Sequence, residues 1–319
     1  MASITTVIPV FNGEPHLAEA LDSLARQSRR PDRVVVLDNC STDRTREIVA
    51  GFNGLRCEYR LNERNLGLFG NHNRALELAA ETDYLHFLHA DDVLLPDFCA
   101  RTVELLNNLE GRGMSWCQAE FMDEHGQPLP PIVQPVAGPP EPVELDNFLK
   151  ERARLRADIF VSGTMMKTNR QTIPFRFRED FKQVGDHFFW AEWAGCCAGR
   201  LKAREVLLKY RHHPLSGTSL NQTNLEVYVQ EDWKVIEGIE AMRGKTGLEH
   251  WLRIQKLKCF FAALVQVKIK LARNGSPQYA RQVAKSGRSL VAFPHWWLGK
   301  SAFHLRECLR AIRRSEVRR

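Results

Sequence analysis

The chain has 319 residues and a formal net charge of +7, so it is long enough to bury a substantial core as one large domain or as a domain with an appendage. Its eight cysteines form no CxxC pair, which argues against a disulfide framework or a zinc site and favours a reducing cytoplasm. No secretory signal is predicted, because the N-terminus has no charged leader followed by an apolar core. No membrane span is predicted either, because the longest apolar candidate, 259–267, is too short and is bounded by lysines.

The positive charge is concentrated towards the C-terminal end. Residues 245–319 hold 17 Lys or Arg against three Glu, a net charge of +14, and the residues upstream carry −7. The basic character therefore belongs to this tail and not to the region that holds the motifs described below.

The first 90 residues alternate predicted strands with predicted helices. Apolar, β-branched runs predict strands at 4–11, 33–37, 55–61 and 84–88, and helical spacing predicts helices at 16–27, from about 44 onward, and at 69–80. Strands that alternate with helices at this interval indicate βαβ units and a largely parallel sheet.

Polar side chains follow three of the four predicted strands. Asn12 and Glu14 follow the first, Asp38 the second, and Asp91 and Asp92 the fourth. Open α/β sheets bind ligands beyond the carboxyl ends of their strands, and Mg²⁺ is usually held there by one or two carboxylates together with substrate phosphates. We therefore expect metal-assisted chemistry on a phosphorylated substrate. Taken alone, the two adjacent acids fit equally well at the start of a loop, with Asp92 capping a turn.

Four segments resemble, in order and spacing, the inverting nucleotide-sugar glycosyltransferases of family two, which have the GT-A fold. They are VIPVFN at 7–12, LDNCSTDRT at 37–45, NLGLFGNHNRAL at 65–76 and HADD at 89–92. The resemblance covers roughly residues 4–220. It implies a mixed, mostly parallel sheet flanked by helices, with a catalytic domain at 1–220 and a basic helical extension at 221–319.

The resemblance also implies the activity. We expect a metal-dependent transfer, with inversion, of a sugar from a nucleotide-diphosphate donor to the hydroxyl of a glycan or a lipid-linked acceptor. Cell-surface polysaccharide or glycolipid synthesis is the process that such an enzyme would serve, in the cytoplasm or at the inner face of the membrane.

Several positions match nucleotide-binding residues of the family. Pro9, Phe11 and Glu14 match the first-strand motif that lies along the nucleoside, and Asp38 matches the acid that accepts a hydrogen bond from the base or ribose. Asn65, Gly70 and Asn73 match the loop and helix that close over the nucleotide.

Asp91 matches the second acid of the family's DxD motif, which binds Mn²⁺ or Mg²⁺ against the diphosphate. The first position of that motif is His89 in this chain. Coordination of the metal, a hydrogen bond to a ribose hydroxyl and an inert role all stay open for His89.

The candidate general base is Asp186, at the head of a predicted helix within 176–194. This segment resembles the family's ED-type motif, whose acid takes the proton from the acceptor hydroxyl. Asp186 also suits a plain helix N-cap. Glu179 and Asp180 are the competing acids, and the family pattern gives Glu179 a structural role.

Three further stretches carry weaker expectations. A late strand at 202–210 leads into Arg211, His212 and His213, a basic segment that could close over the diphosphate, although a solvated loop fits equally well. Of these we count Arg211 and His212, with Asp92, as candidate contacts to the diphosphate or the acceptor. An apolar segment at 159–168 would line the sugar and acceptor pocket in the family. The stretch 127–143 holds seven of the 15 prolines and predicts an extended surface connection.

The tail is predicted to be helical from 221 onward. A stripe made of Leu257, Phe260, Phe261, Leu264 and Val265 is expected to pack on the catalytic domain. In the last helix Leu305, Cys308, Leu309 and Ile312 form one face and arginines occupy the flanks, with Phe293, Trp296 and Trp297 just before it. Docking on the protein's own core and association with an anionic membrane surface both fit this pattern, and nucleic-acid binding is disfavoured.

Two rival functions are retained. A sugar-nucleotide nucleotidyltransferase shares similar architecture, but the Gly-rich, basic first loop of that class is missing. A catalytically inactive relative that still binds nucleotide sugars is motivated by His89. A Rossmann dehydrogenase is disfavoured because no GxGxxG follows the first strand.

Overall fold

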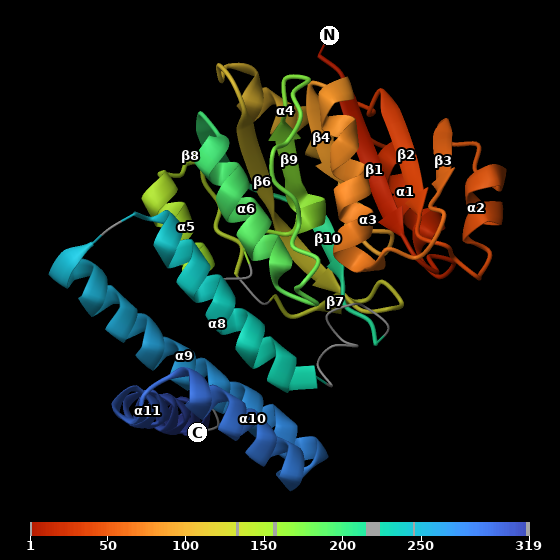
Figure 1. Cartoon of the computed structure of the whole chain (residues 1–319). Coiled ribbons are helices and arrows are strands. Elements are labelled where there is room, and N and C mark those ends of the chain that lie inside the picture. Colours follow the sequence, from red (N-terminus) through yellow and green to blue (C-terminus); the bar gives the residue numbers. More distant parts are fainter. Residues whose placement is uncertain (1, 132–133, 156–157, 215–223, 245, 317–319) are drawn as a thin grey trace. The chain divides into compact units, whose positions relative to one another are not determined.

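The computed structural model describes residues 2–131, 134–155, 158–214, 224–244 and 246–316. The chain divides into two compact units (Figure 1). An α/β unit comprises residues 1–148 and 156–216, and a helical unit comprises residues 149–155 and 217–319. The predicted boundary at 220 lies outside the described residues.

One mixed sheet carries the α/β unit. Its strands are β1 (Ile4–Val10), β2 (Arg33–Asp38), β3 (Cys57–Leu61), β4 (Tyr84–Phe87), β5 (Val93–Leu94), β6 (Gly113–Met122), β7 (Pro128–Leu129), β8 (Glu141–Pro142), β9 (Thr164–Lys167) and β10 (Gly199–Arg211). The order is β3-β2-β1-β4-β9-β6-β10-β5, with β7 paired to β6 and β8 to β10. The longest pairings run parallel, and β9 lies antiparallel between β4 and β6. The predicted mixed, mostly parallel sheet is confirmed.

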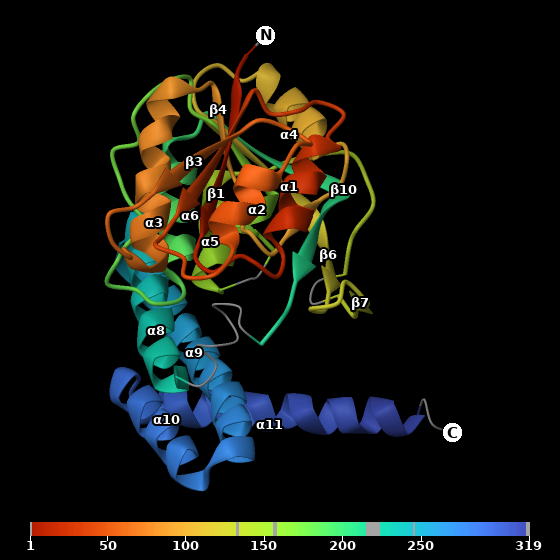
Figure 2. The same cartoon turned by 90° about the vertical axis from the view of Figure 1, so that its right-hand side faces the viewer.

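Helices cover both faces of this sheet. They are α1 (Leu17–Ala25), α2 (Thr45–Gly51), α3 (Gly67–Leu76), α4 (Phe98–Asn107) and α6 (Gly185–Cys196), with short 3₁₀ turns at Glu77–Glu81 and Val161–Gly163. Helix α5 (Leu145–Ala153) is divided between the two units. Figure 2 shows α3 on one side of the sheet and α1 with α4 on the other. All seven residues of β1 are buried, as expected for a central strand covered on both faces.

The proline-rich stretch runs along the surface, as the sequence predicts. Residues 134–139 are exposed, and the two-residue strands β7 and β8 lie in this stretch. Proline has no N–H to give to a ladder, so such strands are confined to the margins of a sheet.

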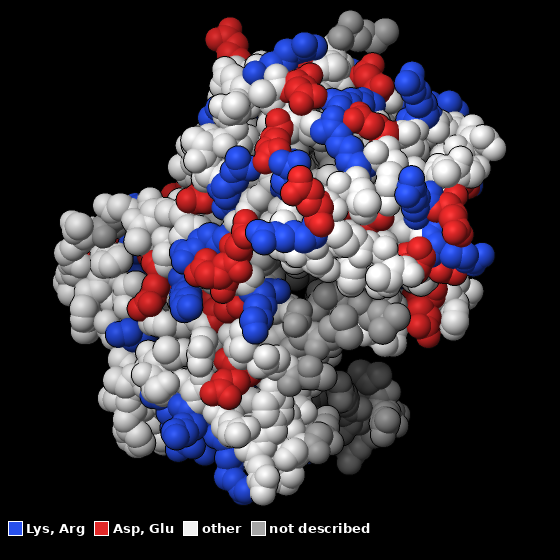
Figure 3. All heavy atoms as spheres, turned by 45° about the vertical axis from the view of Figure 1, so that its right-hand side comes forward, with Lys and Arg blue, Asp and Glu red and all other residues white. Residues whose placement is uncertain are grey.

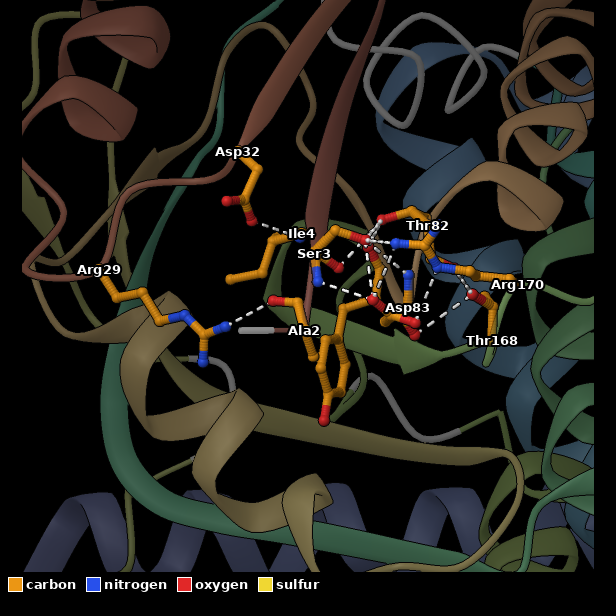
Figure 4. Close-up of polar contacts among 10 residues, drawn as sticks. Ala2, Ser3, Ile4, Arg29, Asp32, Thr82, Asp83, Thr168 and Arg170 are labelled. Atoms are coloured by element: carbon orange, nitrogen blue, oxygen red, sulfur yellow. Dashed lines mark hydrogen bonds and ion pairs between the residues drawn. The ribbon is translucent and has the colours of Figure 1, made fainter.

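A polar cluster fixes the N-terminal ends of β1 and β4 (Figure 4). The backbone N–H and the hydroxyl of Ser3 donate to one carboxylate oxygen of Asp83, at 2.8 and 2.9 Å. Arg170 donates to the other oxygen of Asp83 at 3.1 Å. The hydroxyl of Thr82 donates to the carbonyl of Ser3, and that of Thr168 donates to the carbonyl of Thr82. The cluster therefore fixes the register of β1, β4 and β9. It lies at the N-terminal ends of β1 and β4, away from the polar residues that follow these two strands.

The helical unit has an apolar core of its own. Its helices are α8 (Leu225–Met242), α9 (Gly247–Gly275), α10 (Pro277–Leu290) and α11 (Phe293–Glu316). Within the stripe predicted on α9, Leu257, Phe261 and Val265 are buried against Trp233 of α8 and Val283 of α10. The expectation that this stripe packs on the catalytic domain overlooked the partners supplied by the neighbouring tail helices.

No helix among the described residues combines the length and the hydropathy that crossing a bilayer would require. The side chains of residue 305 and of residues 307–316, which include most of the predicted last amphipathic face, lie outside the described part of the structure.

The Asp83 cluster yields a stability prediction. Replacing Asp83 with Ala leaves the Ser3 donors without their acceptor, so we expect the free energy of unfolding to fall by about 1–3 kcal/mol. Urea titration followed by circular dichroism measures the change. The control is Asp22→Ala, which removes an exposed ion pair with Arg26 and should cost about 0.5 kcal/mol or less. Equal losses of unfolding free energy in the two variants would contradict the stabilising role of the Asp83 cluster.

Candidate active site

The strand order reverses direction at β1. The chain adds β2 and β3 on one side of β1 and then returns to place β4 on the other side. Such a reversal opens a crevice beyond the carboxyl ends of the strands, where α/β proteins bind ligands. The loops after β1, β2 and β4 therefore all open onto one place.

Pro9 marks the point where β1 and β4 separate. Their pairing ends at Val7 and Phe87, and the N–H of Leu88 still donates to the carbonyl of Val7. Pro9, two residues further, faces the same side as Val7 and has no N–H to continue the ladder. Pro9 is buried, so its effect is on the backbone that borders the crevice.

The loop after β1 is joined to the loop after β2. The N–H of Asn12 donates to the Ser41 hydroxyl, and the Asn12 side chain accepts from the N–H of Thr42, both at 2.8 Å. Glu14 accepts from the Arg44 side chain at 2.8 Å, and this bond lowers the pKa of the Glu14 carboxyl. Glu14 therefore connects the two loops. The ring of Phe11 is 51% exposed at the same edge.

Asp38 ends β2 with its carboxylate buried. One oxygen accepts from the Tyr59 hydroxyl at 2.5 Å, and the other accepts from the N–H of Ser41 at 2.8 Å. Burial, together with Asp38, raises the pKa of Tyr59 to about 12, so Tyr59 stays a donor at neutral pH. Each carboxylate oxygen keeps a second lone pair with which it could accept from a ligand.

A network of asparagines supports the crevice from β2 to α3. Asn39 donates to Asn65 at 2.9 Å, and Asn62 donates to both Asn39 and Asn71, at 3.0 and 2.8 Å. The side chain of Asn65 also accepts from the N–H of Gly67, the first residue of α3. Only Asn65 was predicted from the sequence. The other three could have been suspected because Asn recurs just after β2, just after β3 and within α3.

Asn73 ties α3 to the segment that precedes α6. Its amide nitrogen donates to the carbonyl of Phe177 and to Glu179, both at 2.9 Å, and its oxygen accepts from the N–H of Phe177 at 2.8 Å. All of these bonds stay inside the protein, and Glu179 has the kind of structural partner that the family pattern implies. A Cβ at Gly70 would lie 2.9 Å from Leu66, so the first turn of α3 leaves little room there.

Asp186 lies in the first turn of α6 and is half-buried. The residue at the N-cap position is Val184, which makes no side-chain cap bond, and Asp186 follows it in the first turn. A Cβ at Gly185 would lie only 2.8 Å from the ring of Phe69 in α3. Gly185 thus allows the start of α6 to approach α3. Asp180 is exposed and pairs with Arg178 at 2.7 Å.

His89, Asp91 and Asp92 form a cluster that could hold a metal ion. One ligand atom from each lies within 4.8 Å of the others. Asp92 is 1% exposed and accepts from the Ser162 hydroxyl at 2.5 Å and from the N–H of Arg211 at 3.0 Å. Burial, with Asp91 beside it, raises the pKa of Asp92 well above its usual range. Asp92 is therefore the interior brace of this loop.

Asp91 is the exposed acid of the cluster, with 29% of its side chain accessible. Burial of its carboxyl group acts to raise the pKa of Asp91, but the hydrogen bond from His213 and the neighbouring His89 outweigh burial and lower it. The Nε2 atom of His213 lies 2.9 Å from the carboxylate. At neutral pH Asp91 is thus an anion that faces the crevice.

Two hydrogen bonds identify the ring nitrogen that His89 presents to the acids. His72 Nδ1 lies 2.8 Å from the carbonyl oxygen of Leu68, which can only accept, so Nδ1 carries the proton. Burial, with His89 nearby, lowers the pKa of His72 to about 3, so His72 is neutral and its Nε2 is an acceptor. His89 Nε2, 3.2 Å away, must donate to it. Burial lowers the pKa of His89, which favours its neutral form, and in that form Nδ1, 4.0 Å from Asp92, carries a lone pair suited to a metal.

Arg211 and His212 have different surroundings from those expected. Arg211 is 2% exposed; its Nε donates to the carbonyl of Asp91 at 2.9 Å, and the rest of its guanidinium pairs with Glu19 and with the carbonyls that follow β6. Arg211 is thus a buried brace. His212 is exposed, and His213, which the site prediction left out, contacts Asp91. Side chains alternate sides along an extended segment, so residues 211 and 213 lie on the same side and residue 212 on the other. Because Arg211 faces Asp91, His213 faces it too, and His212 does not.

Three comparisons with known proteins agree with this geometry. The model of the family described as Glycosyl transferase family 2 matches residues 5–173. An uncharacterised glycosyltransferase of Methanocaldococcus jannaschii is 26% identical over 219 residues, which are 65% of this chain and 70% of that protein.

Two solved structures share the fold at low sequence identity. Residues 1–349 of TarS from Staphylococcus aureus, in complex with UDP-GlcNAc, superpose with a TM-score of 0.57 at 16% identity over 90% of each chain. The mannosyltransferase PcManGT from Pyrobaculum calidifontis, in complex with GDP-Man and Mn²⁺, gives 0.53 at 16% identity over 98% of this chain and 87% of that one. The GT-A fold expected from the sequence is confirmed.

The pairing of His72 with His89 can be tested through metal binding. In His72→Phe the ring still stacks on Phe87, but His89 loses the acceptor that fixes its orientation, so we expect roughly tenfold weaker Mn²⁺ binding. Calorimetric titration measures the affinity, and the melting temperature checks that the fold is retained. His125→Phe, at an exposed position, is the matched control. An unchanged Mn²⁺ affinity in His72→Phe would contradict this account of His89.

Proposed function

The chain belongs to glycosyl transferase family 2, and from that premise we propose that it transfers a sugar, with inversion, from a nucleotide-diphosphate donor to an acceptor hydroxyl with the help of a divalent ion. The observation that carries the proposal is the convergence of the loops after β1, β2 and β4 at one reversal of strand order, where Asp91 presents an anionic carboxylate. The family makes the chain a glycosyltransferase; the donor, the acceptor and the metal are the proposed parts.

We propose that His89 and Asp91 hold the ion. The cluster fits such a group because its donors are one carboxylate and one imidazole nitrogen with a free lone pair, a mixed set that suits Mn²⁺ better than Mg²⁺. A bound ion would act as a Lewis acid on the departing diphosphate. His213 already contacts Asp91 and is a further candidate ligand. Asp92 and Arg211 hold the loop from the interior side.

The nucleoside is proposed to lie along the loops after β1 and β2. The half-exposed ring of Phe11 offers an apolar surface for the base, and Asp38, which is 1% exposed, would accept a base or ribose hydrogen once the loop that covers it moved. Glu14, Asn65, Gly70 and Asn73 form the bonds and close contacts that shape these loops. In this proposal they orient the binding surface, and direct nucleotide contacts are assigned to Phe11 and Asp38.

Asp186 is proposed as the general base. Of the three acids between 179 and 186, Glu179 is engaged by Asn73, and Asp180 is exposed and paired with Arg178. Asp186 lies in the first turn of α6 and is the acid that matches the base of the family's motif. Asp186 would take the proton from the acceptor hydroxyl as its oxygen attacks the anomeric carbon.

The acceptor is proposed to be a glycan or a lipid-linked saccharide in polysaccharide or glycolipid synthesis at the inner face of the membrane. Exposed apolar side chains at the start of α11 support contact with a lipid surface, because Phe293 is 77% and Trp297 58% exposed. The rival, an inactive relative that only binds nucleotide sugars, is separated from this proposal by assays of turnover.

The first experiment screens UDP, GDP, dTDP and CDP with Mn²⁺ by thermal shift and then measures hydrolysis of the matching sugar nucleotide. Asp91→Asn removes the anionic ligand, so we expect Mn²⁺-dependent hydrolysis to fall by roughly 10²-fold or more. Asp97→Asn, an exposed change nearby in sequence, should keep wild-type hydrolysis. Hydrolysis that persists in Asp91→Asn, or that ignores chelation of Mn²⁺, would count against the metal.

The proposed base makes a separate prediction. Asp186→Asn keeps the shape of the side chain but cannot take a proton, so we expect kcat for transfer to fall roughly 10²–10⁴-fold while donor affinity changes little. Steady-state transfer kinetics and calorimetric donor binding measure the two quantities. Asp180→Asn is the control and should stay close to wild type. If Asp180→Asn were the variant that lost kcat, the assignment of the base would be wrong.

A further inference from the structure

The helical unit contains a pocket of about 510 Å³ bordered by α9, α10 and α11. Figures 1 and 2 both show these three helices packed together. Each helix contributes one face, because the lining residues recur at three- and four-residue spacing along it. The volume lies within the range of ordinary small-molecule pockets, roughly 300–1,000 Å³.

The charged residues that line this pocket are all basic. They are Arg273 from α9, Arg281 and Arg288 from α10, and Lys300 from α11. Among the described residues, no acidic side chain pairs with any of the four. All four side chains are exposed at the mouth of the pocket, where solvent weakens their mutual repulsion, and together they make its described charged lining positive and so favour an anion.

Other cations show that this arrangement is not the rule in the unit. Lys268 on α9 lies 2.9 Å from Asp232, and Arg253 lies 3.4 Å from Glu240. On the face of the molecule in Figure 3, basic and acidic side chains are likewise interspersed over the α/β unit. Among the described residues, the four pocket cations are thus distinguished by lining one pocket together with no acidic side chain in its lining.

A buried donor lies in the same pocket. Gln266 is 8% exposed, and its Nε2 is buried with no hydrogen-bond partner in the described part of the chain. A buried N–H without an acceptor costs about 1–3 kcal/mol, so natural structures seldom leave one unsatisfied without a reason. Gln266 also lines the pocket, so an acceptor group bound there would satisfy Nε2 once the side chain turned towards it.

The remaining lining is apolar. Ile269 and Ala280 are buried in the wall, and Trp296 presents its indole beneath the guanidinium of Arg288, 5.7 Å from the ring centre. Phe293 and Trp297, on the same helix as Trp296, are largely exposed. An anion that fits this lining has an apolar part as well as a charged one.

We propose that this pocket binds a phosphate or diphosphate group carried on an apolar chain. A phosphate monoester has a charge of about −1.5 to −2 and three acceptor oxygens, which answers several cations and an amide donor better than a single carboxylate does. Arginine also matches phosphate oxygens with paired N–H donors. The site goes beyond the proposed sugar transfer, and its test uses no transfer assay.

The experiment titrates the full-length protein with dihexanoyl phosphatidic acid and, separately, with inorganic phosphate and pyrophosphate. We expect saturable binding of the amphiphile, at least about tenfold tighter than that of either inorganic ion, because the apolar lining adds buried area. Flotation with phosphatidylcholine vesicles that contain phosphatidic acid then tests whether a headgroup in a bilayer reaches the pocket. Inorganic ions that bind as tightly as the amphiphile, or vesicles that recover no protein, would overturn the proposal.

A charge-matched pair of variants separates the pocket from general attraction. Arg281→Gln with Arg288→Gln removes two pocket cations and should weaken amphiphile binding roughly tenfold or more. Lys256→Gln with Lys285→Gln removes two exposed cations from α9 and α10 outside the pocket and should leave binding within twofold. Equal losses in the two double variants would reduce the effect to diffuse electrostatics and overturn the site.

Gln266→Leu tests the buried donor. Removing an unsatisfied amide should leave the melting temperature unchanged or raised while amphiphile binding weakens severalfold. A loss of stability with unchanged binding would show that Gln266 serves only the fold. Hydrolysis of the sugar donor, measured on the same preparations, should match wild type in every variant, so failure of the proposed transfer and failure of this site are seen in different assays.

Discussion

Strand β1 pairs with β2 on one side and with β4 on the other, and the arrangement of the candidate site depends on this double parallel pairing. Parallel neighbours end at the same edge, so Asn12, Asp38 and the loop that holds Asp91 are delivered to one crevice. Pro9 releases β4 from β1 at the point where the crevice must open. At the opposite edge, the contacts of Asp83 hold the strands in register.

Charged groups around the crevice fall into two kinds. Asp92 and Arg211 are buried, and their bonds stay inside the protein, where they fix the loop after β4 to β10. Asp91 and His89 remain partly exposed. Asp91 and Asp92 therefore have different roles although they are adjacent in the sequence, because the backbone of the turn directs the side chain of Asp92 inward and that of Asp91 outward. Ionisation follows the same division: Asp91 is held as an anion, and burial pushes Asp92 towards its neutral form.

Much of the site could be predicted because it depends on short-range order. The ends of β2 and β4 are visible as apolar runs that stop at Asp38 and just before Asp91, and the four segments that resemble the family lie within the first 92 residues. Contacts between distant segments were harder to foresee. The bonds from Asn73 to Phe177 and Glu179 join residues more than 100 positions apart in the sequence. The contact of His213 with Asp91 depends on where β10 ends relative to the loop after β4. The apolar stripe of α9 was recognised, but its packing partners in α8 and α10 were not. Hydrophobic periodicity shows which face of a helix is buried, but it does not show which element packs against that face.

The three bonds of Asn73 have a mechanical consequence. Helix α3 begins at the asparagine network beside the loop after β2, and the segment held by Asn73 leads into the turn that carries Asp186. A shift of α3 would be carried to that turn by these bonds and by the stacking of Phe69 on Phe177. Movement on one side of the crevice would therefore displace the carboxylate of Asp186, although no bond of Asn73 reaches Asp186 directly in the contacts described above.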